Sequence, residues 1–205
     1  LQQQYLQAAN KLSLSRQKAA KSFSKQVEQY IHQMNMAEAV FNIEVEHQAL
    51  SSPNKTGLDT VQFMVSTNKG QAADKLEKVV SGGELSRIGL AIQVISSSNN
   101  DIATLVFDEV DSGISGSTAS VVGQLLRKLG ESAQVICVTH LPQVAARAHN
   151  QMFVTKFSDH KTTETHMICL QESERIEELA RLLAGDSLTE SAIANAKELL
   201  QISNS

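Results

Sequence analysis

Residues 104–116 read TLVFDEVDSGISG, an apolar stretch that runs directly into three acids, Asp108, Glu109 and Asp111. Carboxylates this close repel one another, and beside an apolar interior each favours its neutral form unless a cation or polar ligand compensates it. Around this stretch the pattern predicts a strand over 104–109 and a helix over 115–130. A second strand is predicted over 134–140, which makes a β-α-β series typical of a parallel sheet.

The second predicted strand ends in QVICVTH, and its last residue is His140. A single right-handed crossover would place both strand ends at the same edge of the sheet, where ligands of parallel sheets bind. Hydrolysis of a phosphoanhydride requires an acid that holds Mg²⁺, a second acid that polarises water and an imidazole that contacts the terminal phosphate. The sequence therefore predicts half of a magnesium–nucleotide pocket at Asp108, Glu109 and His140.

A second candidate phosphate site lies upstream, in VVSGGELSR at residues 79–87. Two glycines before a helix predicted over 84–98 would let the backbone approach an anion at the positive end of the helix dipole. Ser81 would add a hydroxyl. Taken alone, Ser-Gly-Gly is more often a turn or a helix cap. Its combination with VFDE and VTH in this order favours the phosphate site.

The rest of the body alternates further strands and helices. The stretches 41–48 and 60–67 predict a hairpin, and 151–158 with 163–170 predict an edge hairpin. Two amphipathic helices follow, with Ser187 and Glu190 as a possible capping box. Their apolar faces are predicted at Ile176, Leu179, Ala180 and Leu183, and at Ile193, Ala196, Leu199 and Leu200.

Residues 1–34 have the spacing of a coiled-coil strand with one offset, and would form a helix about 50 Å long. The predicted seam is Leu1, Tyr5, Ala8, Leu12, Arg16, Ala20, Phe23, Val27, Tyr30 and Met34. A helix of this length is too long to bury on a small domain throughout, so a partner helix outside this chain is expected. The alternative is an ordinary amphipathic helix folded onto the core.

Charge is distributed unevenly along the chain. Residues 1–27 carry five bases and no acid, although the net charge of the chain is -4. Such a segment could contact phosphates, or it could be only the solvated face of a long helix. The acidic body by itself is not expected to bind DNA tightly.

Composition bounds the class of protein. With 205 residues and 41% hydrophobic content, the chain can form one sizeable core, or one domain with an appendage. Two cysteines cannot supply a disulfide framework, the histidines lack metal-ligand spacing, and no apolar run reaches the roughly 18 residues of a membrane span. These features predict a cytoplasmic protein. The first residue is Leu rather than Met, and we expect an excerpt of a longer chain.

Three motifs of the chain resemble those of a known family. SGGELSR, TLVFDEVDSGISG and ICVTHLPQVAA are similar to the ABC signature, the Walker B strand with its D-loop, and the switch-histidine strand of ABC-type ATPase heads. Among such heads, these motif sequences most resemble those of bacterial SMC-like DNA repair ATPases. The resemblance covers nearly the whole chain and implies an α/β, P-loop NTPase head of ABC type. Residues 1–36 would end a coiled-coil arm, and 37–205 would form the C-terminal lobe, with a parallel sheet and flanking helices.

The resemblance also implies roles for individual residues. Asp108 would hold Mg²⁺, Glu109 would orient or deprotonate the attacking water, and His140 would contact the γ-phosphate of ATP. The nucleotide held by the opposite subunit would be capped by Ser81, Gly82, Gly83 and Glu84. Contacts across the dimer are implied for Asp111, Ser112 and Gly113 of the D-loop.

The chain lacks a Walker A motif, and it contains no Gly-Lys dipeptide. In the family that loop belongs to an N-terminal head lobe, so this fragment alone is expected not to hydrolyse ATP. Expected partners are that lobe, a second head and, through the complete protein, DNA at the bacterial nucleoid. Alternatives are another SMC-like or RecF-like head, or a nucleotide-dependent clamp with little turnover. A transporter subunit is disfavoured by the helical arm and by the departures from transporter motifs at Val80, Glu84 and Ser115.

Overall fold

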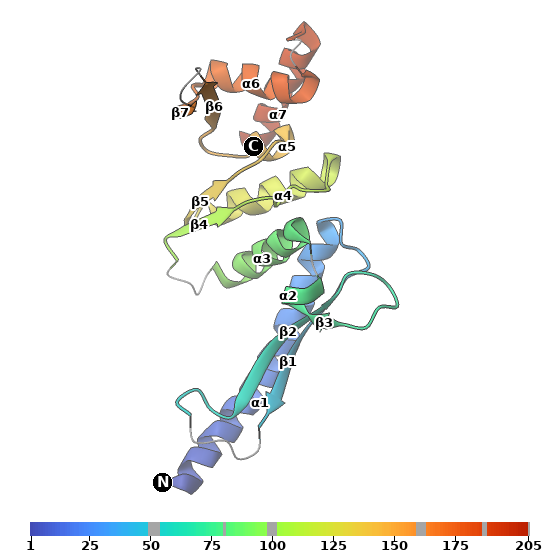
Figure 1. Cartoon of the computed structure of the whole chain (residues 1–205), viewed down its shortest axis with the longest axis vertical. Helices are drawn as coiled ribbons and strands as arrows, with labels where there is room; N and C mark the ends of the chain where they lie inside the picture. The colour runs from blue at the N-terminus through green and yellow to red at the C-terminus, as the bar shows by residue number, and fades with distance from the viewer. Residues whose placement is uncertain (49–53, 80, 98–101, 159–162, 186–187, 205) are drawn as a thin grey trace. The chain divides into compact units, whose positions relative to one another are not determined.

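The computed structural model describes residues 1–48, 54–79, 81–97, 102–158, 163–185 and 188–204 (Figure 1). The chain divides into two compact units, Leu1–Asn100 and Asp101–Ser205. Each unit is described by itself. Within the described ranges, no helix combines the length and the apolar character needed to cross a membrane.

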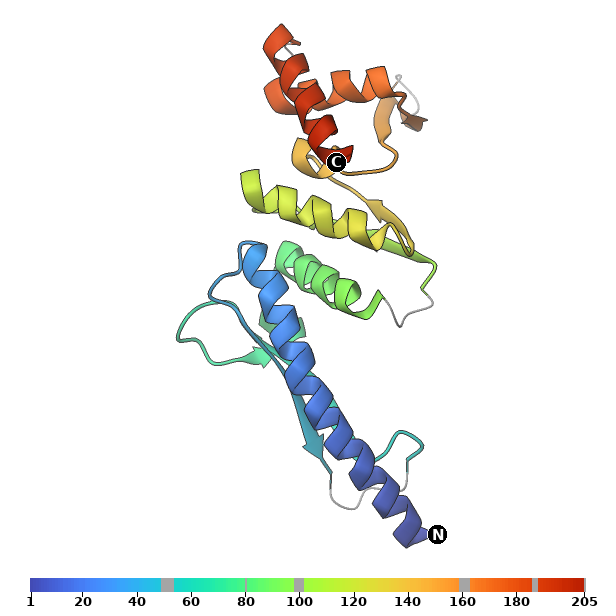
Figure 2. The same ribbon diagram turned by 180° about the vertical axis from the view of Figure 1, so that it is seen from behind.

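The first unit is a long helix packed on a hairpin. Helix α1 (Gln2–Gln33) lies along strand β1 (Val40–His47), which pairs antiparallel with β2 (Asp59–Ser66) (Figure 2). A short strand, β3 (Asp74–Lys75), extends the sheet beside β2. The hairpin predicted over 41–48 and 60–67 is confirmed.

The buried face of α1 shares Ala20 and Val27 with the predicted seam and otherwise differs from it. It consists largely of small residues that let the helix approach the strands closely: Ala9, Ser13, Ala20, Ser24, Val27 and Ile31. Leu12 of the predicted seam is 38% exposed and Leu1 is fully exposed. The helix therefore packs against its own chain, as the amphipathic alternative has it, because a hairpin of eight-residue strands runs alongside it. A partner helix on the remaining seam stays a prediction.

Side-chain hydrogen bonds fix α1 to the hairpin. Ser24 Oγ accepts from the backbone N–H of Ile43 at 3.0 Å, and Glu28 Oε1 accepts from that of Phe41 at 3.0 Å. These bonds satisfy donors at the β1 edge that faces the helix. Two further helices complete the unit: α2 (Leu76–Val79) and α3 (Gly82–Ser96). Helix α3 contacts α1, and begins two residues before its predicted start.

The second unit begins with the predicted β-α-β series. Strand β4 (Thr104–Phe107) and strand β5 (Gln134–Cys137) pair in parallel, joined through helix α4 (Gly116–Leu129). The short helix α5 (Pro142–Ala145) follows. The parallel pair is confirmed, but both strands end earlier than predicted, so the acids and His140 lie in the loops after them.

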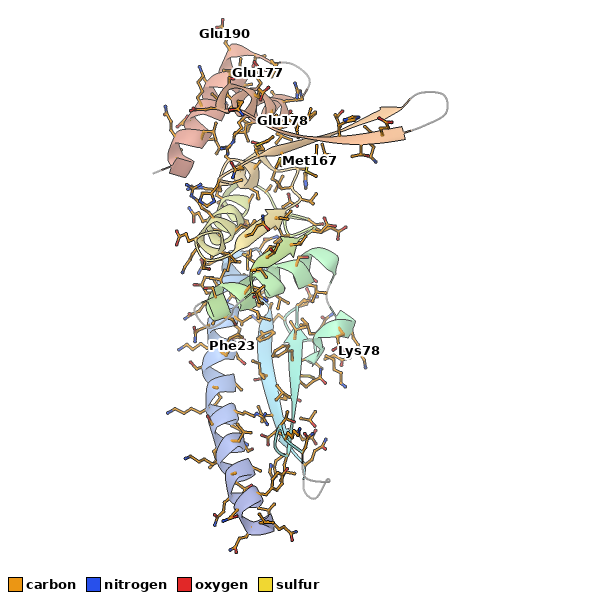
Figure 3. The ribbon with its side chains drawn as sticks, turned by 90° about the vertical axis from the view of Figure 1, so that its left-hand side faces the viewer. Phe23, Lys78, Met167, Glu177, Glu178 and Glu190 are labelled. Carbon is orange, nitrogen blue, oxygen red and sulfur yellow. The ribbon has the colours of Figure 1, made fainter. Side chains whose placement is uncertain are left out.

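The second unit ends with a hairpin and two helices. Strands β6 (Met152–Ser158) and β7 (Thr163–Cys169) pair antiparallel, and helices α6 (Glu172–Ala184) and α7 (Glu190–Asn204) pack together. In the part that the structure describes, β6 and β7 form a separate two-stranded sheet rather than an edge of the β4–β5 sheet (Figure 3). The α6–α7 core centres on Leu179, Ala180, Ala196 and Leu200. Ser187 of the predicted capping box lies outside the described residues.

Candidate nucleotide site at the strand ends

Asp111 connects the loops that follow β4 and β5. Its side chain is buried, with the residue only 3% exposed. Its Oδ2 atom accepts hydrogen bonds from the Thr139 hydroxyl at 2.5 Å and from the backbone N–H of His140 at 3.1 Å. The Thr139 hydroxyl oxygen in turn accepts from the N–H of Leu141 at 3.1 Å. A buried carboxylate is stable here because donors surround it.

The backbone of His140 is held by a hydrogen bond, while its imidazole ring is exposed. Its Nδ1 atom lies 3.3 Å from Oδ2 of Asp111, while its side chain is 71% exposed. The expectation placed His140 with Asp108 and Glu109, and the structure shows a contact of His140 with a third acid, Asp111. Sequence reasoning missed this role of Asp111 and the role of Thr139. The available signal was a small polar residue directly before the histidine in VTH.

The three residues of the predicted D-loop contact differ in exposure. Asp111 was expected to reach across a dimer, but its carboxylate is buried and bonded within its own chain. Ser112 and Gly113 are exposed beside it, and Gly113 has a φ of +72°. These two positions remain predicted contacts with a second head.

Asp108 and Glu109 form a tight turn at the end of β4, and both are exposed. The Oδ1 atom of Asp108 accepts from the backbone N–H of Glu109 at 3.0 Å, and the Glu109 carbonyl accepts from the N–H of Ser112 at 3.0 Å. Glu109 has a φ of 55°, a left-handed conformation that costs a residue with a Cβ about 1 kcal/mol. The surrounding hydrogen bonds hold that conformation, which ends the strand and turns the chain before Asp111.

The pKa of the Cys137 thiol indicates the electrostatic potential at the ends of β4 and β5. Burial, together with the negative charges of Asp111 and Asp108, raises the pKa of Cys137 to about 12. The thiol is therefore neutral at physiological pH. Two carboxylates close enough to affect it create a negative potential at the strand ends, where a bound cation would be stabilised.

The donor set fits magnesium held jointly with a nucleotide. Among the described residues, no group of three His, Cys, Asp or Glu side chains could hold a metal by itself. Mg²⁺ usually keeps several waters and takes one or two carboxylates together with substrate phosphates. Asp108, an exposed carboxylate in a negative potential, suits that role.

The Ser-Gly-Gly segment is a helix cap in this structure. Ser81 is the N-cap of α3: its hydroxyl accepts from the N–H of Glu84 at 3.4 Å, and its own N–H donates to Glu84 Oε2 at 3.0 Å. Ser81 and Gly82 are exposed, and Gly83 is buried. The Glu84 carboxylate thus accepts from the N–H of the N-cap residue, which completes a capping box. The phosphate site stays a prediction.

Arg87 lies one turn into α3, close to the helix cap. Its residue is 5% exposed, so its guanidinium is largely removed from solvent. Burial lowers the pKa of Arg87, and the charge of Glu84 opposes that shift. The nearby negative charge that stabilises the Arg87 cation is therefore the Glu84 carboxylate.

No protein-family model matches the chain. It is 56% identical over 98% of its length to "DNA repair protein RecN" of Vibrio cholerae. It is 50% identical over 95% of its length to the protein of the same name from Haemophilus influenzae. The chain spans 36% and 35% of these relatives, respectively.

Solved structures share the fold at low sequence identity. The Smc head domain with a coiled coil and joint from Pyrococcus yayanosii matches 80% of this chain with a TM-score of 0.56 and 17% identity, over 29% of that structure's chain. The Smc head domain with an extended coiled coil from Pyrococcus furiosus matches 82% with a TM-score of 0.52, over 39% of its own chain. The chain therefore shares the fold of the corresponding part of Smc head domains, as the motifs predicted.

Proposed function

The chain is homologous to the RecN proteins over nearly its whole length, and from this premise we propose that it is the C-terminal head lobe of an SMC-like ATPase. The complete protein would act in recombinational repair of DNA double-strand breaks. The observation that carries the proposal is the coupling of the β4 and β5 ends by Asp111 beside exposed Asp108, Glu109 and His140.

Each exposed residue has a role that its position supports. ATP would supply the phosphoanhydride, and Mg²⁺ would neutralise its charge. Asp108 would hold the metal, directly or through water. Glu109, fixed by the turn, would orient the attacking water and accept its proton. His140 would present its ring to the γ-phosphate, because Asp111 and the backbone hold the base of the residue.

Two heads would be needed for hydrolysis. Ser81, Gly82, Gly83 and Glu84 would cap nucleotide bound by the opposite head, with Ser112 and Gly113 at the dimer contact. Phosphate at the N-terminus of α3 would meet the Ser81 hydroxyl and the first N–H groups of the helix, at the positive end of its dipole.

The N-terminal head lobe is the partner proposed for an uncovered sheet face. Val106, Ile136 and Val138 lie on one face of the β4–β5 pair, and they are 68%, 48% and 61% exposed. Parallel sheets are normally covered on both faces. Since the chain spans about a third of its relatives, the rest of the protein is the natural source of the missing cover. This lobe would also supply the Walker A loop.

The test is Glu109→Gln in the full-length protein. The amide keeps the size of the side chain but cannot accept a proton, so we expect kcat to fall roughly 100-fold or more while ATP binding persists. Closed dimers should accumulate with ATP, as measured by light scattering after size-exclusion chromatography. Glu131→Gln, at an exposed acid after α4, is the matched control.

Two results would contradict the proposal. Unchanged turnover in the Glu109→Gln variant would favour the clamp, in which nucleotide is held with little hydrolysis. Measurable ATP hydrolysis by the 205-residue chain alone would contradict the requirement for a separate Walker A lobe.

A further inference from the structure

Four lysines form a stripe along α1, which we call the basic stripe: Lys11, Lys18, Lys21 and Lys25. All four are exposed. On a helix with 3.6 residues per turn they lie within about 80° of one another, and their centre is about 140° from that of the buried face. The stripe therefore runs along the side of α1 that faces away from its buried face. It extends for about 21 Å at 1.5 Å per residue.

The charge of the basic stripe is not compensated locally. Residues 1–27 contain no acid. The nearest other base, Arg16, is the one that pairs, at 3.0 Å from Asp59. The first acid of the helix, Glu28, accepts a hydrogen bond from Phe41 instead. Within the described ranges, none of the four lysines forms an ion pair.

The opposite face of the same unit carries negative charge. Glu44 and Glu46 are exposed on β1, where they alternate with Phe41, Ile43 and Val45, the more buried residues of the strand. Side chains that alternate along a strand point to opposite faces. Lys75 of β3 lies on the same face as Glu44, so this face is less negative than the two acids alone would make it. A polyanion would still be attracted to α1 in preference to this face.

A coiled-coil partner would leave the stripe open. Leu1, Tyr5 and Leu12 of the predicted seam lie about 135° around the helix from the centre of the lysines. A second helix packed on that seam would cover a different face of α1. The basic stripe can therefore operate in an assembled arm.

The residues around the basic stripe favour a phosphate-rich binding partner over a protein partner. Protein interfaces have apolar centres and are depleted in lysine, whereas glutamines and serines such as Gln7, Ser22 and Gln29 surround these lysines, and Leu14 is their main exposed apolar neighbour. We propose that the basic stripe of α1 binds the phosphate backbone of duplex DNA. This deepens the proposed repair function and rests on it, but it assigns the contact to a surface remote in sequence from the ATPase motifs.

The test replaces all four lysines by glutamine in the full-length protein, since glutamine keeps helix propensity and length. Binding to a fluorescent DNA duplex is measured by anisotropy over a series of salt concentrations. Four lost phosphate contacts should lower the slope of log affinity against log salt by about 3.6, and affinity at roughly 0.1 M salt should fall at least about tenfold. Replacing the four lysines by arginine should retain both quantities.

The matched control changes four exposed lysines on other elements, Lys69, Lys128, Lys156 and Lys197, to glutamine. It has the same net charge as the test variant and should bind DNA within about twofold of wild type. Equal losses in both variants would reduce the effect to net charge and overturn the proposal. So would an unchanged slope in the stripe variant, or a loss confined to an acidic polypeptide such as polyglutamate.

The same preparations separate this proposal from the proposed function. ATP hydrolysis without DNA should be equal in wild type and the stripe variant, because α1 carries no residue of the strand-end site. If the wild type itself hydrolyses no ATP, the ATPase proposal fails while DNA binding still decides the role of the stripe. Circular dichroism on each variant verifies that α1 is intact.

Discussion

The backbone N–H of His140 donates to Oδ2 of Asp111 at 3.1 Å, and the imidazole Nδ1 of the same histidine lies 3.3 Å from that oxygen. One buried carboxylate oxygen thus positions both the main chain and the ring of the proposed γ-phosphate contact. Thr139 adds a third donor. The loop after β5 is consequently held against the loop after β4 by a side chain rather than by the sheet ladder.

Asp111→Ala should destabilise the second unit by about 2–3 kcal/mol, because it leaves the donors of Thr139 and His140 without their acceptor in a buried place. Urea unfolding followed by circular dichroism measures the loss. Thr139→Val, which removes one donor and keeps the shape, should cost only about 1 kcal/mol. An alanine variant as stable as the valine variant would show that Asp111 does not organise the strand ends.

At position 109, replacement by glycine should give a more stable protein than replacement by alanine. Both substitutions remove the carboxylate, but only glycine adopts a φ of 55° without a steric penalty. We expect Glu109→Gly to be more stable than Glu109→Ala by about 1 kcal/mol, measured by thermal or urea unfolding. At exposed Lys128 inside α4 the order should reverse, with glycine about 1 kcal/mol worse than alanine. The same order at both positions would contradict the left-handed turn.

Asp59 should make the first unit sensitive to acid. Burial would raise the pKa of its carboxyl, but hydrogen bonds from Ser13, Arg16 and His47, together with the charge of Arg16, outweigh burial and lower the pKa. A lowered folded-state pKa means stabilisation that is complete above the unfolded pKa of 3.8. It is lost as pH falls through the folded value.

The check compares wild type with Asp59→Asn in urea at pH 7 and pH 3. The variant should have the lower unfolding midpoint at pH 7, and the two midpoints should converge toward acid pH, because protonation makes the wild-type residue neutral as well. A difference in midpoint that does not change with pH would indicate that the Asp59 charge contributes nothing. Glu46→Gln, an exposed acid on the neighbouring strand, controls for the loss of a charge.

The elements themselves could be predicted from the sequence because their signals are local. Hydrophobic alternation placed both hairpins, and helical periodicity placed α3 and α4 within a few residues of their observed bounds and indicated α6 and α7. The order of VFDE, one helix and VTH was sufficient to predict the parallel pair, since a single crossover permits little else. The motifs likewise indicated the SMC head fold.

Contacts between distant side chains required the tertiary structure. Three acids within four residues look alike in sequence, yet only folding decided that Asp111 is buried on Thr139 and His140 while Asp108 and Glu109 stay exposed. The left-handed turn at Glu109 contributes to this, because it changes the direction of the chain between the end of β4 and Asp111. The buried face of α1 was likewise chosen by the hairpin that packs on it, and the opposite face was thereby left to the lysines. Local periodicity cannot contain that information, because it belongs to the partner surface rather than to the helix.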